Sequence, residues 1–193
     1  AQVNWETDIN NGDRPLLIEA LLRKEWGTWE NGWGVQAGVM NAPLSLEHTG
    51  PAATPLYTLT PSALSTWVWE EGRIVGVAVD WWRVLANEMR LSLLLGSGFG
   101  ADQKGRLLAV RGWVMSDSLV GVNSELPLPM WRESVSVFDE RDGRPSLYSL
   151  ATLTNERETL SFRLGYFETL GDQSTQGVCD TRFATAGILL RRA

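Results

Sequence analysis

Few residues of this 193-residue chain have the types and spacing that catalysis requires. His48 is the only histidine, so a multi-histidine metal site is excluded, and no G-x-S-x-G elbow accompanies it as in a serine hydrolase. Glycosidases use two carboxylates that flank the sugar bond. The paired acidic residues at 70–71 and 139–140 fall at expected turns, and nothing marks a partner for Glu168. The sequence therefore predicts no enzyme activity, no cofactor and no metal site.

A different set of polar residues alternates with apolar ones, which would place it on one face of extended strands. Where such a face lines a lumen, its charges select solutes electrostatically. Arg111, in "AVRGW", is the strongest single candidate, because an arginine between apolar runs is costly unless it faces water or a partner. The alternative is that these are ordinary strand residues facing solvent. The predicted pore-lining residues are Glu19, Arg23, Gln36, Asp80, Arg90, Arg111 and Arg163.

Alternation of apolar and polar residues dominates the chain and predicts the strands that must position these side chains. The clearest strands are expected at 16–26, 33–42, 73–82, 105–116 and 158–168. The turn "GTWENG" separates the first two, and Asn31-Gly32 is expected to supply its positive φ. The stretch 80–95 is compatible either with one helix or with two strands joined through "LANE". The chain is thus predicted to be a single all-β domain over 1–193, an antiparallel meander of about ten strands.

Two all-β architectures fit this pattern, a soluble β-sandwich or jelly roll and a transmembrane β-barrel. The strands expected above reach the ~9–11 residues that a membrane strand needs. The less apolar face carries Gly, Arg, Gln and Ser, as a lumen face does. Tryptophans near strand ends are typical of an interfacial girdle, and Trp67, Trp69 and Trp82 occupy such positions. The predicted interfacial residues are Trp26, Trp29, Trp33 and Trp81.

Composition narrows the function classes further. The chain has 17 Lys plus Arg against 23 Asp plus Glu, a net charge of −6, which argues against a nucleic-acid partner. One cysteine, Cys179, excludes an internal disulfide framework. No apolar run approaches the ~18 residues of a membrane helix. The opening "AQVNWE" is typical of a mature terminus left by signal peptidase, which predicts export.

Several blocks together resemble a known protein family. They are "VQAGVMNAPLSLEHTGP" (35–51), "TLTPSALSTWVWEEGRIVGV" (58–77), "GRLLAVRGWVMSD" (105–117), "ELPLP" (125–129), "RLGYFETLGDQ" (163–173) and "DTRFATAGILL" (180–190). In order and character, along most of the chain, they resemble the porin-like outer-membrane proteins of Gram-negative bacteria. Those proteins are longer, and their last strand commonly ends in an aromatic residue, whereas this chain ends "ILLRRA".

The resemblance implies an antiparallel transmembrane barrel in the bacterial outer membrane that allows passive diffusion of small solutes. Its implied partners are the lipid bilayer, small solutes and either further copies of the chain or the remainder of a larger barrel. The alternative is a secreted β-sandwich that binds carbohydrate through exposed tryptophans. One geometric observation separates the two: the alternating apolar residues of 75–79 and 91–95 face lipid in a barrel and a shared core in a sandwich.

Overall fold

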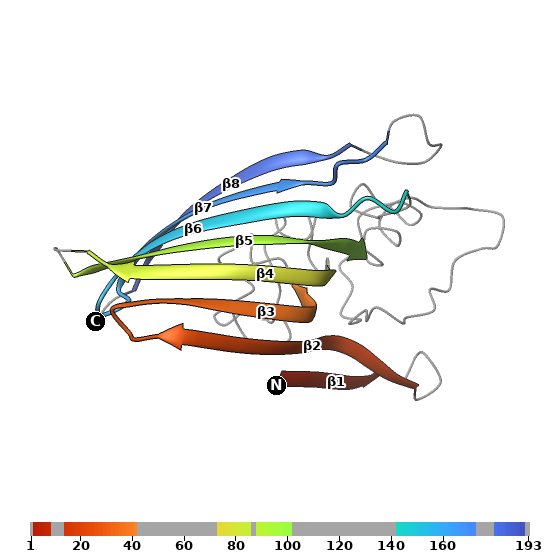
Figure 1. Ribbon diagram of the computed structural model, residues 1–193, viewed down its shortest axis with the longest axis horizontal. Helices are drawn as coiled ribbons and strands as arrows, with labels where there is room; N and C mark the ends of the chain where they lie inside the picture. Colours follow the sequence, from red (N-terminus) through yellow and green to blue (C-terminus); the bar gives the residue numbers. More distant parts are fainter. Residues whose placement is uncertain are drawn as a thin grey trace.

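A computed structural model of the protein describes residues 2–8, 14–41, 73–85, 88–101, 142–172 and 180–191. These residues form one antiparallel sheet in which every strand pairs with its neighbour in sequence, in the order β1 to β8 (Figure 1). This confirms an all-β antiparallel meander. The strands are β1 (Gln2–Asp8), β2 (Arg14–Gly27), β3 (Asn31–Asn41), β4 (Arg73–Val84), β5 (Met89–Ala101), β6 (Ser146–Asn155), β7 (Leu160–Glu168) and β8 (Arg182–Leu190).

Most strands coincide with the alternating segments of the sequence. The stretch 80–95 forms two strands rather than a helix, with β4 ending at Val84 and β5 beginning at Met89. Alternation did not predict β1 or β6. The strand expected at 105–116 lies outside the described residues, and the described residues contain eight strands.

The turn between β2 and β3 differs from the sequence prediction in its backbone. Its positive φ, 112°, is at Gly27, whereas Asn31 and Gly32 already belong to the extended strand β3. A Cβ atom on Gly27 would collide with the backbone of Asn31 and Gly32, so glycine is required there. Thr28 closes the turn by donating its backbone N–H to the Asn31 carbonyl oxygen at 2.8 Å. The assignment of the positive φ to Asn31-Gly32 was therefore wrong.

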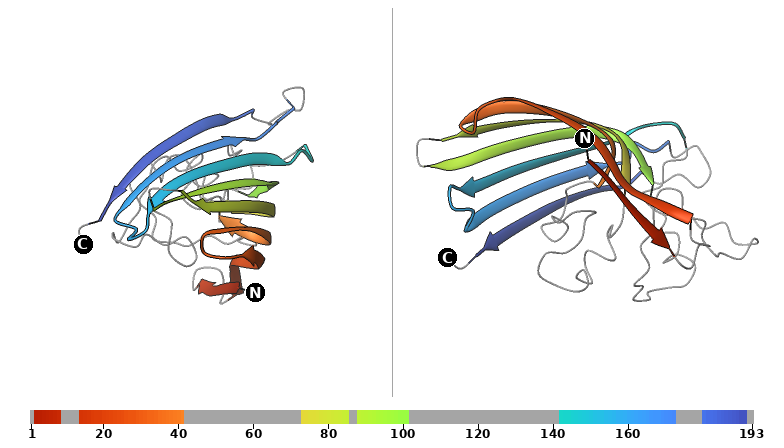
Figure 2. Two further views of the ribbon diagram at one scale, coloured as in Figure 1. Left: turned by 60° about the vertical axis from the view of Figure 1, so that its left-hand side comes forward. Right: turned by 90° about the horizontal axis from the view of Figure 1, so that it is seen from below.

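The sheet is strongly curved and forms an open trough (Figure 2). In the described part of the chain β1 and β8 are its two edges, each paired on one side only, so the sheet is not closed. The buried core lies on the concave face and consists of Ile74, Ala78, Tyr148 and Phe167, against which Leu94 and Phe183 pack. The other face of the same strands is convex.

Glycines on the concave face allow large side chains of the next strand to lie flat against the backbone. The ring of Tyr148 covers Gly96, its partner in the register between β5 and β6. The indole of Trp82 covers Gly32 in the same way between β4 and β3. A side chain at either glycine would displace the ring, so these pairs fix how closely the core packs.

None of the described residues forms a helix that is long and apolar enough to cross a membrane. Nor does this part of the chain bring three or more His, Cys, Asp or Glu residues together in a group that could hold a metal ion.

Candidate functional site: the two faces of the curved sheet

The convex face is apolar and exposed. The register aligns Val35 of β3 with Val79 of β4, and Val79 with Leu95 of β5, so these side chains form a continuous surface across strands. The exposed fraction is 48% for Val79 and 66% for Leu95, which excludes a shared core for them. Leu91 is half-buried on the same face. Large apolar side chains exposed on this face of β2 to β8 are Leu22, Val75, Val77, Val79, Leu93, Leu95, Phe99, Leu147, Phe162, Leu164, Ile188 and Leu190, hereafter the apolar band.

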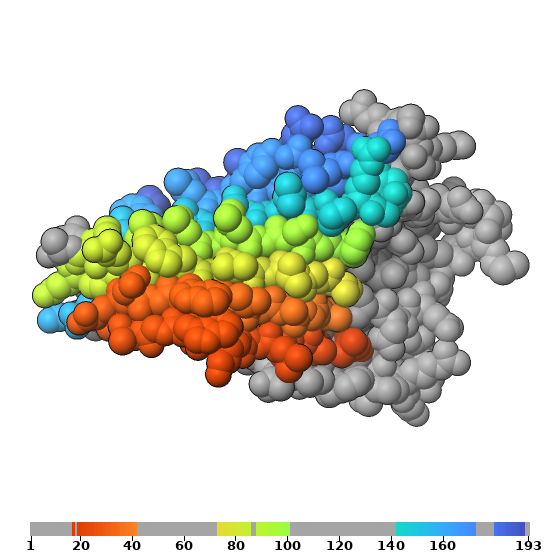
Figure 3. Space-filling view, in the orientation of Figure 1, coloured from red at the N-terminus to blue at the C-terminus, as the bar shows by residue number. Residues whose placement is uncertain are grey.

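Figure 3 views this convex face, where the side chains of neighbouring strands form an unbroken surface. Charged residues lie mainly at the two ends of the apolar band. Arg83 is exposed near the end of β4. At the opposite end Arg182 contacts Glu168 at 2.7 Å and Asp180 at 3.2 Å. Of the convex-face side chains that the structure describes, Lys24 is the one charged group within the band.

An aromatic row crosses three strands at the end of the apolar band nearest the β2–β3 turn. Trp26 and Trp33 are register partners whose rings stack with centroids 4.2 Å apart. Trp81 is the partner of Trp33 on β4, and all three are partly exposed. This places three of the four predicted interfacial tryptophans in one row on the convex face.

The remaining tryptophans of the prediction lie elsewhere. Trp29 is in the β2–β3 turn, where its ring contacts Arg90 rather than the row. Trp82 is 6% exposed and lies on the concave face, so its assignment to an exterior girdle was wrong. Its neighbour Trp81 points to the opposite side, as successive residues of a strand must. Trp67 and Trp69 lie outside the described residues.

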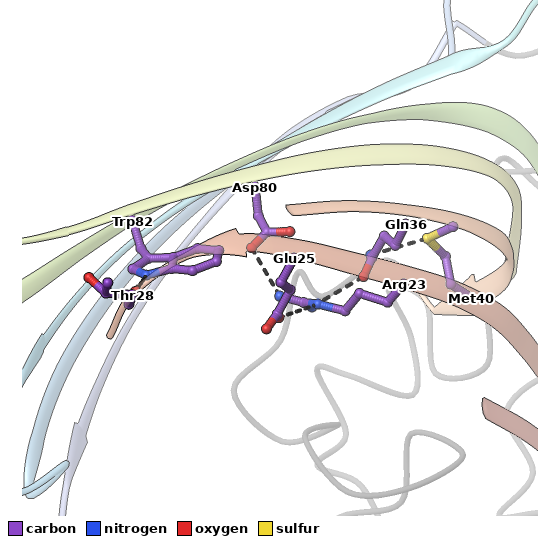
Figure 4. A network of polar contacts seen from close by, with 7 residues as sticks. All are labelled: Arg23, Glu25, Thr28, Gln36, Met40, Asp80 and Trp82. Carbon is purple, nitrogen blue, oxygen red and sulfur yellow. Dashed lines mark hydrogen bonds and ion pairs between the residues drawn. The ribbon is translucent and has the colours of Figure 1, made fainter. Parts of the chain in front are cut away.

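The concave face carries a polar network centred on Arg23 (Figure 4). Its guanidinium contacts Asp80 at 2.9 Å and Glu25 at 2.7 Å and donates a hydrogen bond to Gln36 Oε1 at 3.3 Å. The Asp80 side chain is 11% exposed and lies over Gly34, where any Cβ would crowd its carboxylate. Arg23 therefore forms an ion pair with a nearly buried carboxylate.

Met40 connects this network to the core of the trough. Gln36 Nε2 and the Tyr148 hydroxyl both point to the Met40 sulfur, each at 3.4 Å. The contacts run from β2 through β3 to β6, although these strands are not all adjacent in the sheet. The concave face is thus filled by side chains that meet across the trough, and polar groups form part of the filling.

A second polar region of the concave face lies toward the short turns. The Arg90 guanidinium lies 4.4 Å from the ring centroid of Trp29 and 5.3 Å from that of Trp82. Trp82 is itself held by the hydrogen bond that its Nε1 donates to the Thr28 carbonyl oxygen at 2.9 Å. Arg163 on β7 is a half-buried residue of the same face.

The structure therefore brings six of the seven predicted pore-lining residues to the concave face. Glu19 is counted among them because it lies an even number of residues from Arg23 on β2. It unites Arg23, Gln36 and Asp80 in one network and separates them from Arg90 and Arg163. Arg111 lies outside the described residues. The alternation predicted that Met40 shares the face of Gln36. Sequence reasoning did not anticipate Tyr148 or Trp82 at this face, because aromatic residues carry no lumen signal.

Comparisons of the chain with protein-family models, with curated proteins and with solved structures find no match. The geometry of the two faces is accordingly what bears on function.

Proposed function

We propose that the chain is an outer-membrane β-barrel protein that forms a porin-like channel for passive diffusion of small solutes. The apolar band carries the proposal. Water-soluble sheets bury their apolar face, whereas membrane barrels turn it outward to lipid and keep polar groups inside. Here the exposed face is apolar across β2 to β8, and the ion pairs of Arg23 lie on the concave face.

Strand length supports a membrane location. The 13 residues of β5 and the 12 of β4 exceed the ~5–6 residues usual in globular sheets. At ~3.3 Å per residue β5 is about 40 Å long, and a tilt of ~40° reduces its span to about 30 Å, the thickness of a bilayer hydrocarbon core. The row of Trp26, Trp33 and Trp81 then lies where interfacial aromatics gather.

The number of residues between successive strands alternates between small and large along the chain. The turns after β2, β4 and β6 cover only residues 28–30, 85–88 and 156–159. In the sequence, 42–72, 102–145 and 169–181 separate β3 from β4, β5 from β6 and β7 from β8. Outer-membrane barrels have short periplasmic turns and longer extracellular loops. We therefore place the turns at 28–30, 85–88 and 156–159 on the periplasmic side.

The proposal requires that the sheet close in the membrane. Lipid offers no hydrogen bonds to the open edges of a sheet, and each unsatisfied backbone group costs several kcal/mol there. The free edges of β1 and β8 must then pair with each other, with further strands or with another copy of the chain. The curvature of the trough supports this requirement, because a barrel is a sheet that curves in one sense (Figure 2).

Fractionation and reconstitution test the proposal together. We expect the protein to require detergent for extraction and to conduct ions after insertion into planar bilayers. Brominated phospholipids should quench its tryptophan fluorescence, because Trp26, Trp33 and Trp81 would lie near the acyl chains. Recovery as a stable monomer from a detergent-free soluble fraction would refute it.

The aromatic row supports one alternative, a carbohydrate-binding protein, since exposed rings also stack on sugars. That function predicts fluorescence quenching by oligosaccharides in the absence of lipid. Quenching by brominated lipid without any response to oligosaccharides would exclude it.

A further inference from the structure

Arg90 is held in an unusual way on the concave face. Its guanidinium contacts the rings of both Trp29 and Trp82, one from the β2–β3 turn and one from β4. Trp82 is fixed by its hydrogen bond to Thr28 and by its packing on Gly32. The guanidinium therefore lies against two indoles that come from different parts of the sheet, and its orientation is restricted before any ligand arrives.

These contacts use the π faces of the indoles and supply no acceptor for the N–H groups of Arg90. No carboxylate among the described residues forms an ion pair with it, and its buried Nε has no hydrogen-bond partner there. Arg23 on the same face differs, because Asp80, Glu25 and Gln36 occupy its donors. A buried donor without an acceptor costs about 1–3 kcal/mol, more when it is charged. Arg90 is thus a cation to which the described residues offer aromatic rings but no anionic partner.

The neighbouring side chains of the concave face are suited to an anion. Thr154 of β6 is the register partner of Arg90, and its hydroxyl is 3.0 Å from that of Ser161 on β7. Arg163 lies two residues from Ser161 on the same face. With strands ~4.8 Å apart and ~3.3 Å per residue, the Cα atoms of Arg90 and Arg163 are about 12 Å apart. Two arginines and a pair of hydroxyl groups therefore occupy neighbouring strands of this face.

We propose that Arg90 anchors a binding site for small oxyanions, solutes bearing a carboxylate or a phosphate, on the concave face beside Trp29 and Trp82. The planar guanidinium would take two oxygens of the anion in parallel. The inference rests on the proposed channel function and specifies its solute class. The site lies toward the short turns and would concentrate anions at that end of the trough.

The first test is equilibrium binding to the full chain in detergent. Inorganic phosphate and succinate serve as separate probes, and tryptophan fluorescence is the readout because Trp29 and Trp82 contact Arg90. We expect saturable changes with at least one probe and a dissociation constant raised about 10-fold or more in Arg90→Gln, since a charge-assisted pair is lost. Arg90→Lys should give an intermediate constant, because it keeps the charge without the planar fork.

Arg83→Gln is the matched control, because it makes the same change near the same end of the sheet but on the convex face. It should bind both probes as the unchanged protein does, and circular dichroism should establish that all variants fold. Equal constants for Arg90→Gln and the unchanged protein, or no saturable binding of either probe, would overturn the site.

The second test measures the reversal potential across a bilayer that separates two concentrations of KCl. Arg90→Gln should shift it toward cation selectivity, and Arg83→Gln should leave it unchanged. Binding that depends on Arg90 in a protein without conductance would refute the channel and support the site. Conductance whose selectivity ignores Arg90, in a protein without oxyanion binding, would refute the site and support the channel.

Discussion

Leu95→Arg tests whether the apolar band faces lipid. Leu95 is the middle residue of β5, six residues from either end, and its side chain is 66% exposed on the convex face. At ~3.3 Å per residue and a tilt of ~40°, it lies about 15 Å below each surface of the bilayer, near the midplane. An arginine on the lipid face costs about 2–4 kcal/mol at that depth. The same substitution on a face exposed to water usually changes the free energy of unfolding by no more than about 0.5 kcal/mol.

The assay is reversible unfolding by guanidinium in thin phosphatidylcholine vesicles, followed by tryptophan fluorescence. The expected loss corresponds to a decrease of roughly 30- to 1,000-fold in the folding equilibrium constant, since about 1.4 kcal/mol is tenfold. Leu164→Arg, at the middle of β7, should cost as much because Leu164 is 63% exposed on the same face.

Leu190→Arg is the matched control. Leu190 is the last residue of β8 and the most exposed residue of the band at 76%. If the band faced water, Leu190→Arg would therefore change the stability at least as much as Leu95→Arg does. Near the interface an arginine costs only about 0–1 kcal/mol. Equal, negligible costs for Leu95→Arg and Leu190→Arg would refute a lipid-facing band.

Three further predictions concern the packing of the sheet. Arg23→Met should destabilise the protein by about 3–5 kcal/mol in denaturant titrations because it leaves the Asp80 carboxylate nearly buried and without its cation, and adding Asp80→Asn should restore most of the loss. Gly96→Val should destabilise the protein by about 1–3 kcal/mol because the valine side chain would overlap the Tyr148 ring. In a chain that also carries Tyr148→Ala, the valine should cost less. Strict additivity in this double-mutant cycle would contradict the contact. Trp33→Ala should remove a stacking contribution of about 0.5–1.5 kcal/mol and lower fluorescence quenching by brominated lipid, whereas unchanged quenching would contradict its interfacial position.

The sequence predicted the strands where one face is consistently more apolar than the other. In β4 the alternation of Val75, Val77 and Val79 with smaller or polar residues is unambiguous. β6 was not predicted because "SLYSLATLTN" mixes Leu, Ser and Thr on both faces. It is a strand because β5 and β7 hydrogen-bond to it on both sides, which is information from distant parts of the chain.

The Arg90 site illustrates the same limit at the level of function. Arg90 alternates with Leu91 in the sequence, and this alternation was enough to place Arg90 on the face shared with Asp80. Its contact with Trp29 depends on the backbone of the β2–β3 turn, where Gly27 rather than Asn31-Gly32 adopts the positive φ. Turn geometry decides which side of the sheet such a ring approaches, and the sequence alone did not determine it.

The sequence by itself determined the period of two and hence which residues share a face, because the pleat of a strand is a local property of the backbone. It left open whether the apolar face packs in a core or lies at the surface, since a protein core and a lipid bilayer both accept the same alternation. Tertiary structure decided this: the sheet curves with the apolar residues on its convex side, and the ion pairs of Arg23 lie on the concave side. Curvature and cross-strand packing depend on several strands at once, so no single segment of the sequence contains them.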